Sequence, residues 1–146
     1  MACNSNYKNR NYKSAVTAYN NTAQTYTADG TQLNILGQTV LDTGCSINAV
    51  NSGCTIEHSG LYRIECDVTS TPTTAVSQVL QLLRDTNVMP CAVTTDTTTA
   101  DTTLTQHIET TVLIPVCCNN QPTIGVKLSG TAGSVSHLCM NVTRLA

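Results

Sequence analysis

The chain has 146 residues, of which 11% are charged, and its formal net charge is −2. This length fits one domain, and the weak negative charge excludes the basic surface that a nucleic-acid-binding protein needs. No apolar run is long enough to span a membrane, so neither nucleic acid nor a membrane is expected as a partner.

The composition favours β-structure. The sequence contains no Phe and no Trp but 26 threonines, and Thr is enriched in strands and disfavoured inside helices. The polar N-terminus has no apolar signal segment, which predicts synthesis in a reducing cytoplasm. Cys66 and Cys139 lie in strand-like patterns and are expected to be small core residues. The spacing of cysteines and histidines predicts no zinc site, and the redox state of the eight cysteines stays open.

The first residues differ in charge from the rest. Lys8, Arg10 and Lys13 give residues 1–13 a charge of +3, whereas the remainder carries four basic and nine acidic residues. This segment has no apolar period. We therefore expect a flexible basic arm over residues 1–14, followed by one domain over residues 15–146. The arm is either simply solvated or docks on a larger partner.

Short strands separated by turn residues are predicted in the first third of the chain. Asn20-Asn21 separates two runs that look like edge strands joined by a turn. Asp42-Thr43-Gly44 is expected to be a turn that ends a strand, and Asn51-Ser52-Gly53 is the turn of a hairpin. The predicted strands are residues 15–19, 24–27, 38–41, 46–50 and 54–57.

The clearest strand is the run from Gly60 to Thr69, which alternates strictly. Apolar or small side chains fall on one face, and Arg63, Glu65 and Asp67 fall on the other. Because successive side chains of a strand point to opposite faces, this pattern predicts one buried and one solvated face, as in antiparallel sheets. The residues expected in the core are Tyr62, Ile64, Cys66 and Val68.

The second half of the chain continues in the same way. The apolar residues of 76–84 would also fit a helical stripe, but the short run and the turn residues beyond it favour a strand. Further strands are predicted at residues 88–93, 104–116, 123–128 and 137–145. Loops or turns are predicted at residues 70–74, 94–103 and 130–133.

About ten short strands at intervals of roughly 8–12 residues are typical of a sandwich or barrel. Four segments in order resemble the C1q/TNF-like jelly-roll family, in the variant found in bacteriophages and prophages. The resemblance covers residues 30–146 and implies an all-β, antiparallel jelly-roll sandwich that assembles as a homotrimer and has no catalytic site or cofactor. The absence of Phe and Trp departs from the family and leaves the core and trimer axis to aliphatic residues, Thr and Tyr. The segments are Asp42–Ile47, Gly60–Tyr62, Gln81–Asp85 leading into Val88–Pro90, and Asn141–Leu145, with Cys117-Cys118 before a Pro-x-Ile strand.

The resemblance implies a structural virion protein, a head fibre or capsid decoration protein on the outside of the capsid, made in the cytoplasm of a bacterial host. The arm would attach it to the major capsid protein or another head protein through Lys8, Arg10 and Lys13. The exposed loops could contact a host surface glycan, since binding usually sits on loops of a rigid scaffold.

Two alternatives stay open. The first is a trimeric cell- or spore-surface domain like those of exosporium glycoproteins, although the chain has no Gly-x-y stalk. The second is a retroviral-type aspartic protease, because Val40–Ser46 resembles the active-site loop of those enzymes and two copies would supply two Asp42 carboxylates. A turn at Asp42 is favoured, and no enzyme is expected. His58, His107 and His137 could be metal ligands, and three copies of a strand histidine such as His107 could bind an ion on a trimer axis, but no metal is expected.

Overall fold

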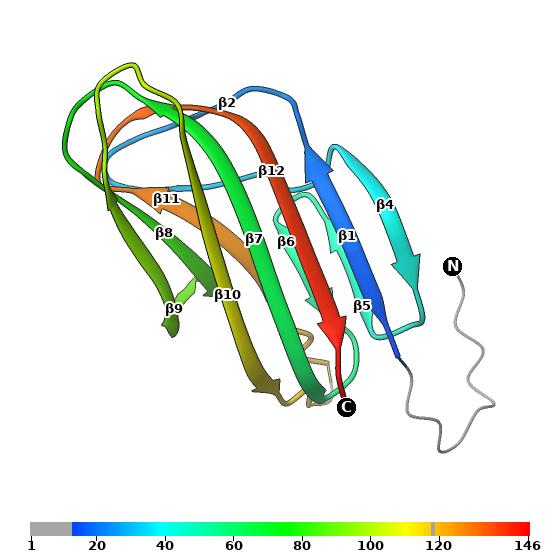
Figure 1. The fold of residues 1–146 in the computed structure, drawn as a ribbon. Coiled ribbons are helices and arrows are strands. Elements are labelled where there is room, and N and C mark those ends of the chain that lie inside the picture. Colours follow the sequence, from blue (N-terminus) through cyan, green and yellow to red (C-terminus); the bar gives the residue numbers. More distant parts are fainter. Residues whose placement is uncertain (1–12, 118) are drawn as a thin grey trace.

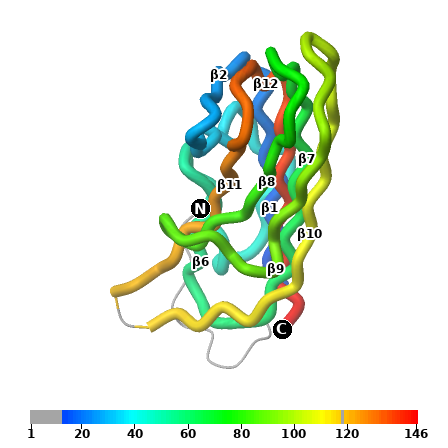
Figure 2. Tube along the Cα trace, turned by 90° about the vertical axis from the view of Figure 1, so that its left-hand side faces the viewer, coloured from blue at the N-terminus to red at the C-terminus, as the bar shows by residue number. Residues whose placement is uncertain are grey.

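The structure is a computed structural model that describes residues 13–117 and 119–146. Within these residues, twelve strands form two antiparallel sheets of six strands each, stacked as two layers (Figures 1 and 2). The predicted all-β antiparallel sandwich is therefore confirmed. No helix among the described residues is long and apolar enough to cross a membrane.

The strand order of each sheet joins segments that are far apart in the sequence, as in a jelly roll. Sheet A has the order β10-β7-β12-β1-β4, with β2 paired to β12. Its strands are β1 (Ala15–Asn20), β2 (Gln24–Tyr26), β4 (Gln38–Thr43), β7 (Gly60–Pro72), β10 (Leu104–Ile114) and β12 (Gly133–Arg144).

Sheet B has the order β5-β6-β11-β8-β9, with β3 paired to β11. It contains β3 (Thr31–Gln32), β5 (Ile47–Val50), β6 (Gly53–Ile56), β8 (Ser77–Arg84), β9 (Asn87–Thr97) and β11 (Thr123–Ser129). Residues 76–84, which also fitted a helical stripe, lie almost entirely in β8, where both neighbouring strands satisfy the backbone hydrogen bonds.

The core lies between the sheets and is filled by aliphatic side chains. On β7 the predicted inward residues are confirmed, since none of the four is accessible to solvent. β12 buries every second residue in the same way. With no Phe or Trp available, the large fully buried side chains are mainly Leu and Ile, with Tyr62 and Met140. The inward residues on these two strands are Tyr62, Ile64, Cys66, Val68, Leu138, Met140 and Val142.

A buried polar network links the two sheets near one end. The Gln78 amide nitrogen in β8 donates to Ser70 Oγ (2.9 Å) and to Gln106 Oε1 (2.7 Å) in sheet A. The Tyr26 hydroxyl donates to Gln78 Oε1 (2.5 Å), and Gln106 donates to Asp96 Oδ2 (2.7 Å). Burial raises the pKa of Tyr26. Because the polar groups satisfy one another, the two glutamines can be buried without a large desolvation cost.

Several predicted loops are shorter than expected because the strands run further. β7 continues through Pro72 and β9 through Thr97, so the loops narrow to residues 73–76 and 98–103. β12 already begins at Gly133, and β10 ends at Ile114 rather than at residue 116. Residues 94–97 were predicted as a loop because they contain no apolar side chain. They continue β9 instead, because threonines can form a strand with a solvated face.

The prediction of an edge hairpin at the N-terminus is wrong. β1 lies inside sheet A between β12 and β4, and β2 pairs with β12 instead of β1. The short strand β3 was not predicted. The turn predicted at Asp42 is also displaced: Asp42 pairs with Val16 as part of β4, and the chain leaves the strand only at Gly44. Local turn residues cannot reveal these distant partners.

The cysteines divide into buried and accessible groups. Cys54 and Cys66 are free and buried, and burial raises the pKa of the Cys54 thiol to about 12 and that of Cys66 further. Both therefore serve as small core residues, as predicted for Cys66. Cys139 does not, because it is half-buried on the outer face of sheet A. Cys45 is disulfide-bonded.

Candidate functional site

The outer face of sheet A changes character along the paired strands β7 and β10. The register places Thr69 opposite Thr105, and their hydroxyls lie 3.1 Å apart. Just beyond this register, the hydroxyls of Thr71 and Thr103 lie 3.3 Å apart. Charged residues follow in the middle of the two strands. At the far end Leu61 lies opposite Leu113, whose side chain is 68% exposed. The face therefore passes from hydroxyls through charges to apolar side chains.

The charged middle of this face forms one connected cluster, which we call the β7–β10 cluster: Arg63, Glu65, Asp67, His107 and Glu109. Arg63 binds both glutamates through their Oε1 atoms, with Nη2 2.8 Å from Glu65 and 2.9 Å from Glu109. His107 Nδ1 lies 2.7 Å from Asp67 Oδ1, and its Nε2 lies 3.6 Å from Glu109 Oε2. The hydrogen bond to Asp67 is the main cause that raises the pKa of His107.

The cluster places like charges directly opposite each other. Glu65 and Glu109 are cross-strand partners, an arrangement that by itself destabilises a sheet. Among the described residues, Glu65, His107 and Glu109 are the only group of three ligand-type side chains whose ligand atoms lie within 4.8 Å of one another. The three histidines are not brought together, because His58 lines a pocket elsewhere and His137 hydrogen-bonds Asn21.

Sequence reasoning placed Arg63, Glu65 and Asp67 on a solvated face and predicted a strand over residues 104–116, but it did not identify this cluster. The alternation of residues 60–69 and 104–116 was visible in the sequence. The register between the two strands was not, and that register alone brings Glu65 opposite Glu109.

The loops predicted as a contact surface gather at one end of the molecule, which we call the apex (Figure 1): residues 73–76, 98–103 and 130–132. The Thr73 amide donates to Ala132 O (2.9 Å), and the Asp101 amide donates to Pro72 O (2.8 Å). The hydroxyls of Thr74 and Thr131 lie 2.7 Å apart. These bonds hold three sequence-distant loops together as one threonine-rich surface.

The first described residues, which follow directly on the predicted arm, lie at the end opposite the apex, near the C-terminus (Figure 1). Lys13 is exposed and lines a pocket together with Arg144 and Leu145. Lys8 and Arg10, the other two residues expected to attach the protein, lie outside the described residues. Ser14, which was expected in the arm, is buried; its Oγ accepts from the Ser46 amide (3.0 Å) and its carbonyl from the Arg144 amide (2.8 Å).

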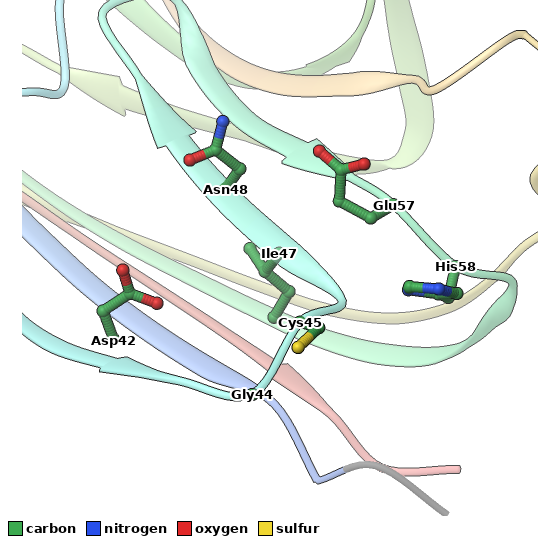
Figure 3. Close-up of a pocket in the computed structure, with 7 residues that line it drawn as sticks. All are labelled: Asp42, Gly44, Cys45, Ile47, Asn48, Glu57 and His58. Carbon is green, nitrogen blue, oxygen red and sulfur yellow. The ribbon is translucent and has the colours of Figure 1, made fainter. Parts of the chain in front are cut away.

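A polar pocket lies beside Asp42, the residue of the protease hypothesis (Figure 3). Asp42 comes from β4, whereas Glu57 and His58 follow β6, and Ile47 stands between Asp42 and Glu57 in this view. Asp42 belongs to a paired strand, in contrast to the active-site loop that the protease hypothesis requires. The pocket is lined by Asp42, Gly44, Cys45, Ile47, Asn48, Glu57 and His58.

Comparison with known proteins relates the chain to others by shape alone. No family model matches the sequence, and no curated protein does. The PRD1 vertex protein P5 superimposes with a TM-score of 0.68 at 14% identity, over 94% of this chain and 100% of the chain in that structure. Murine APRIL gives a TM-score of 0.68 at 14% identity, over 91% of this chain and 99% of the chain in that structure.

The fold is the C1q/TNF-like jelly roll. The globular domain of zebrafish complement 1qA agrees with this, with a TM-score of 0.61 at 9% identity over 91% of this chain and 98% of that domain. The resemblance read from the sequence is thus confirmed at the level of the fold. Within the described residues this jelly roll has twelve strands.

Proposed function

We propose that this protein is a structural component of a phage particle, a trimeric head fibre or capsid decoration protein on the outside of the capsid. The observation that carries the proposal is the similarity in shape to the structure of a phage vertex protein, which extends over 94% of this chain and 100% of the solved chain of that protein.

The polarity of the molecule supports this role. The threonine-rich apex lies at one end, while Lys13 and the C-terminus lie at the other (Figure 1). An arm that attaches to the major capsid protein or another head protein would leave the apex pointing away from the shell. Assembly as a closed homotrimer would point three such surfaces in one direction.

Light scattering on the purified full chain tests the assembly. A mass three times the 15.5 kDa of one chain is expected at micromolar concentration. A monomer under these conditions would contradict the proposed trimer.

Co-sedimentation with phage heads tests the attachment. Replacing Lys8, Arg10 and Lys13 by Ala should weaken binding to heads, and added salt should weaken binding of the unaltered protein, because exposed charges are screened over about 8–10 Å. Arg84→Ala combined with Lys127→Ala removes two positive charges elsewhere and should leave binding unchanged. Full occupancy by the triple variant would show that attachment does not use the basic arm.

The apex is proposed to contact a host surface glycan. Thr99 and Thr102 are exposed there, and hydroxyls on a rigid loop can exchange hydrogen bonds with sugar hydroxyls. Binding of the full chain to a glycan array should be lost when both are replaced by Ala, whereas Thr39→Ala, on exposed β4, should have no effect. Equal binding by both variants would remove the apex from the proposal.

A further inference from the structure

The β7–β10 cluster has more negative charge than its own cations balance. The chain has 7 basic and 9 acidic side chains, not counting histidine. One of the basic side chains, Arg63, and three of the carboxylates lie in this cluster. With His107 neutral, Arg63 alone leaves two negative charges uncompensated. One divalent cation would neutralise this excess.

Arg63 contacts only one of the two carboxylate oxygens of each glutamate. Arg63 contacts Oε1 of Glu65 and Oε1 of Glu109. Oε2 of Glu109 instead faces His107 Nε2 at 3.6 Å. The guanidinium therefore orients both carboxylates while leaving one oxygen of each for another cation.

His107 is oriented as metal-binding histidines are. Its Nδ1 is held by Asp67 Oδ1 at 2.7 Å, which favours the tautomer that keeps the proton on Nδ1 and the lone pair on Nε2. A carboxylate behind the imidazole is the usual outer partner of a ligating histidine, since it fixes the ring and raises the basicity of the ligand nitrogen. The lone pair is thus available on the side of Glu109.

We propose that Glu65, His107 and Glu109 bind one divalent first-row metal ion of the Zn²⁺ class on the outer face of sheet A, within a single chain. A mixed set of imidazole and carboxylate ligands suits such ions better than Ca²⁺ or Mg²⁺, which take oxygen ligands. Bonds of about 2.0–2.2 Å place tetrahedral ligand atoms roughly 3.3–3.6 Å apart. The 3.6 Å between His107 Nε2 and Glu109 Oε2 already fits, and the group as a whole spans no more than 4.8 Å.

Asp67 is a positioning residue in this site, because it acts on the metal through His107. Water can complete the coordination, since the side chains of His107 and Glu109 are 52% and 41% exposed. The inference does not depend on the proposed virion role, and either can fail without the other.

The test is a Zn²⁺ titration of the untagged full chain. The readout is the imidazole NMR signals of its three histidines, recorded at each Zn²⁺ concentration. The signals of His107 should shift until one ion is bound per chain, while those of His58 and His137 stay in place as internal controls. Site-specific signals are needed because accessible thiols such as Cys91 and Cys117 also bind zinc.

Single substitutions test which carboxylates act in the metal site and which do not. Glu109→Gln and Glu65→Gln should each raise the Zn²⁺ concentration needed to shift His107 by about tenfold or more, and Asp67→Asn should raise it by about 10–100-fold. Glu57→Gln should leave it unchanged. A melting curve for each variant confirms that it is folded.

Three results would overturn the proposal. In the first, the His107 signals do not respond to millimolar Zn²⁺. In the second, Glu109→Gln and Glu65→Gln respond as the unaltered protein does, so that the imidazole alone binds. In the third, saturation occurs at one ion per three chains, which would place the ion on an axis between chains.

Discussion

Ile64 and Arg63 are neighbours on β7 with opposite environments. Ile64 is fully buried, whereas the Arg63 side chain is 48% exposed. Ile64→Ala should lower the free energy of unfolding by about 2–5 kcal/mol through lost burial and the cavity left behind. Arg63→Ala should cost only about 0–1 kcal/mol, because exposed ion pairs contribute little. Urea denaturation measures both, and similar losses at the two positions would contradict the assigned faces.

His107 should titrate above its usual range in metal-free protein, because Asp67 and Glu109 favour its charged form. NMR titration of Asp67→Asn should show the pKa of His107 falling toward 6.5, the ordinary value. Since the folded pKa is the higher one, the stabilisation by protonated His107 is complete below the unfolded pKa and is lost as pH rises through the folded pKa. Glu57→Gln is the control, and an unchanged His107 pKa in Asp67→Asn would refute the assigned cause.

At the scale of elements, the network around Gln78 joins β8 to β2, β7 and β10. Gln78 has no exposed surface and makes hydrogen bonds to Tyr26, Ser70 and Gln106. Gln78→Ala should destabilise the protein by about 1–3 kcal/mol, because its buried partners lose their hydrogen bonds. Gln81→Ala, three residues along the same strand and only half-buried, should stay within about 0.5 kcal/mol. Equal midpoints of thermal unfolding would mean that water replaces the lost bonds.

For the whole molecule, the hydrogen bonds of Ser14 allow a test of where the folded domain begins. Deletion of residues 1–12 is expected to leave the melting temperature unchanged, whereas deletion of residues 1–14 should lower it. The longer deletion removes the Ser14 oxygens that accept from the buried Ser46 amide and from the Arg144 amide. Cys45 is disulfide-bonded. Calorimetry should therefore be done under reducing conditions, so that this bond does not contribute to the melting temperature of either deletion. Equal melting temperatures for the two deletions would place Ser14 outside the cooperative unit.

The sequence by itself determined the fold class, most of the strands and the inward residues of β7. A period of two is a local property, and burial of one face follows from it directly. It also placed the charges of β7 on a solvated face. The tertiary structure decided which strands are neighbours, and with them the interior position of β1 and the strand at Thr94–Thr97.

The same distinction applies to the candidate sites. The three loops were recognisable from their polar residues, but only cross-loop hydrogen bonds show that they form one apex. Glu65 and Glu109 are 44 positions apart and meet through the register of β7 and β10. The burial of Gln78 and Gln106 was not predicted, because a glutamine is buried only where partners from other strands satisfy it. Cross-strand register and polar partners are long-range properties of the chain, and no local pattern of residues specifies them.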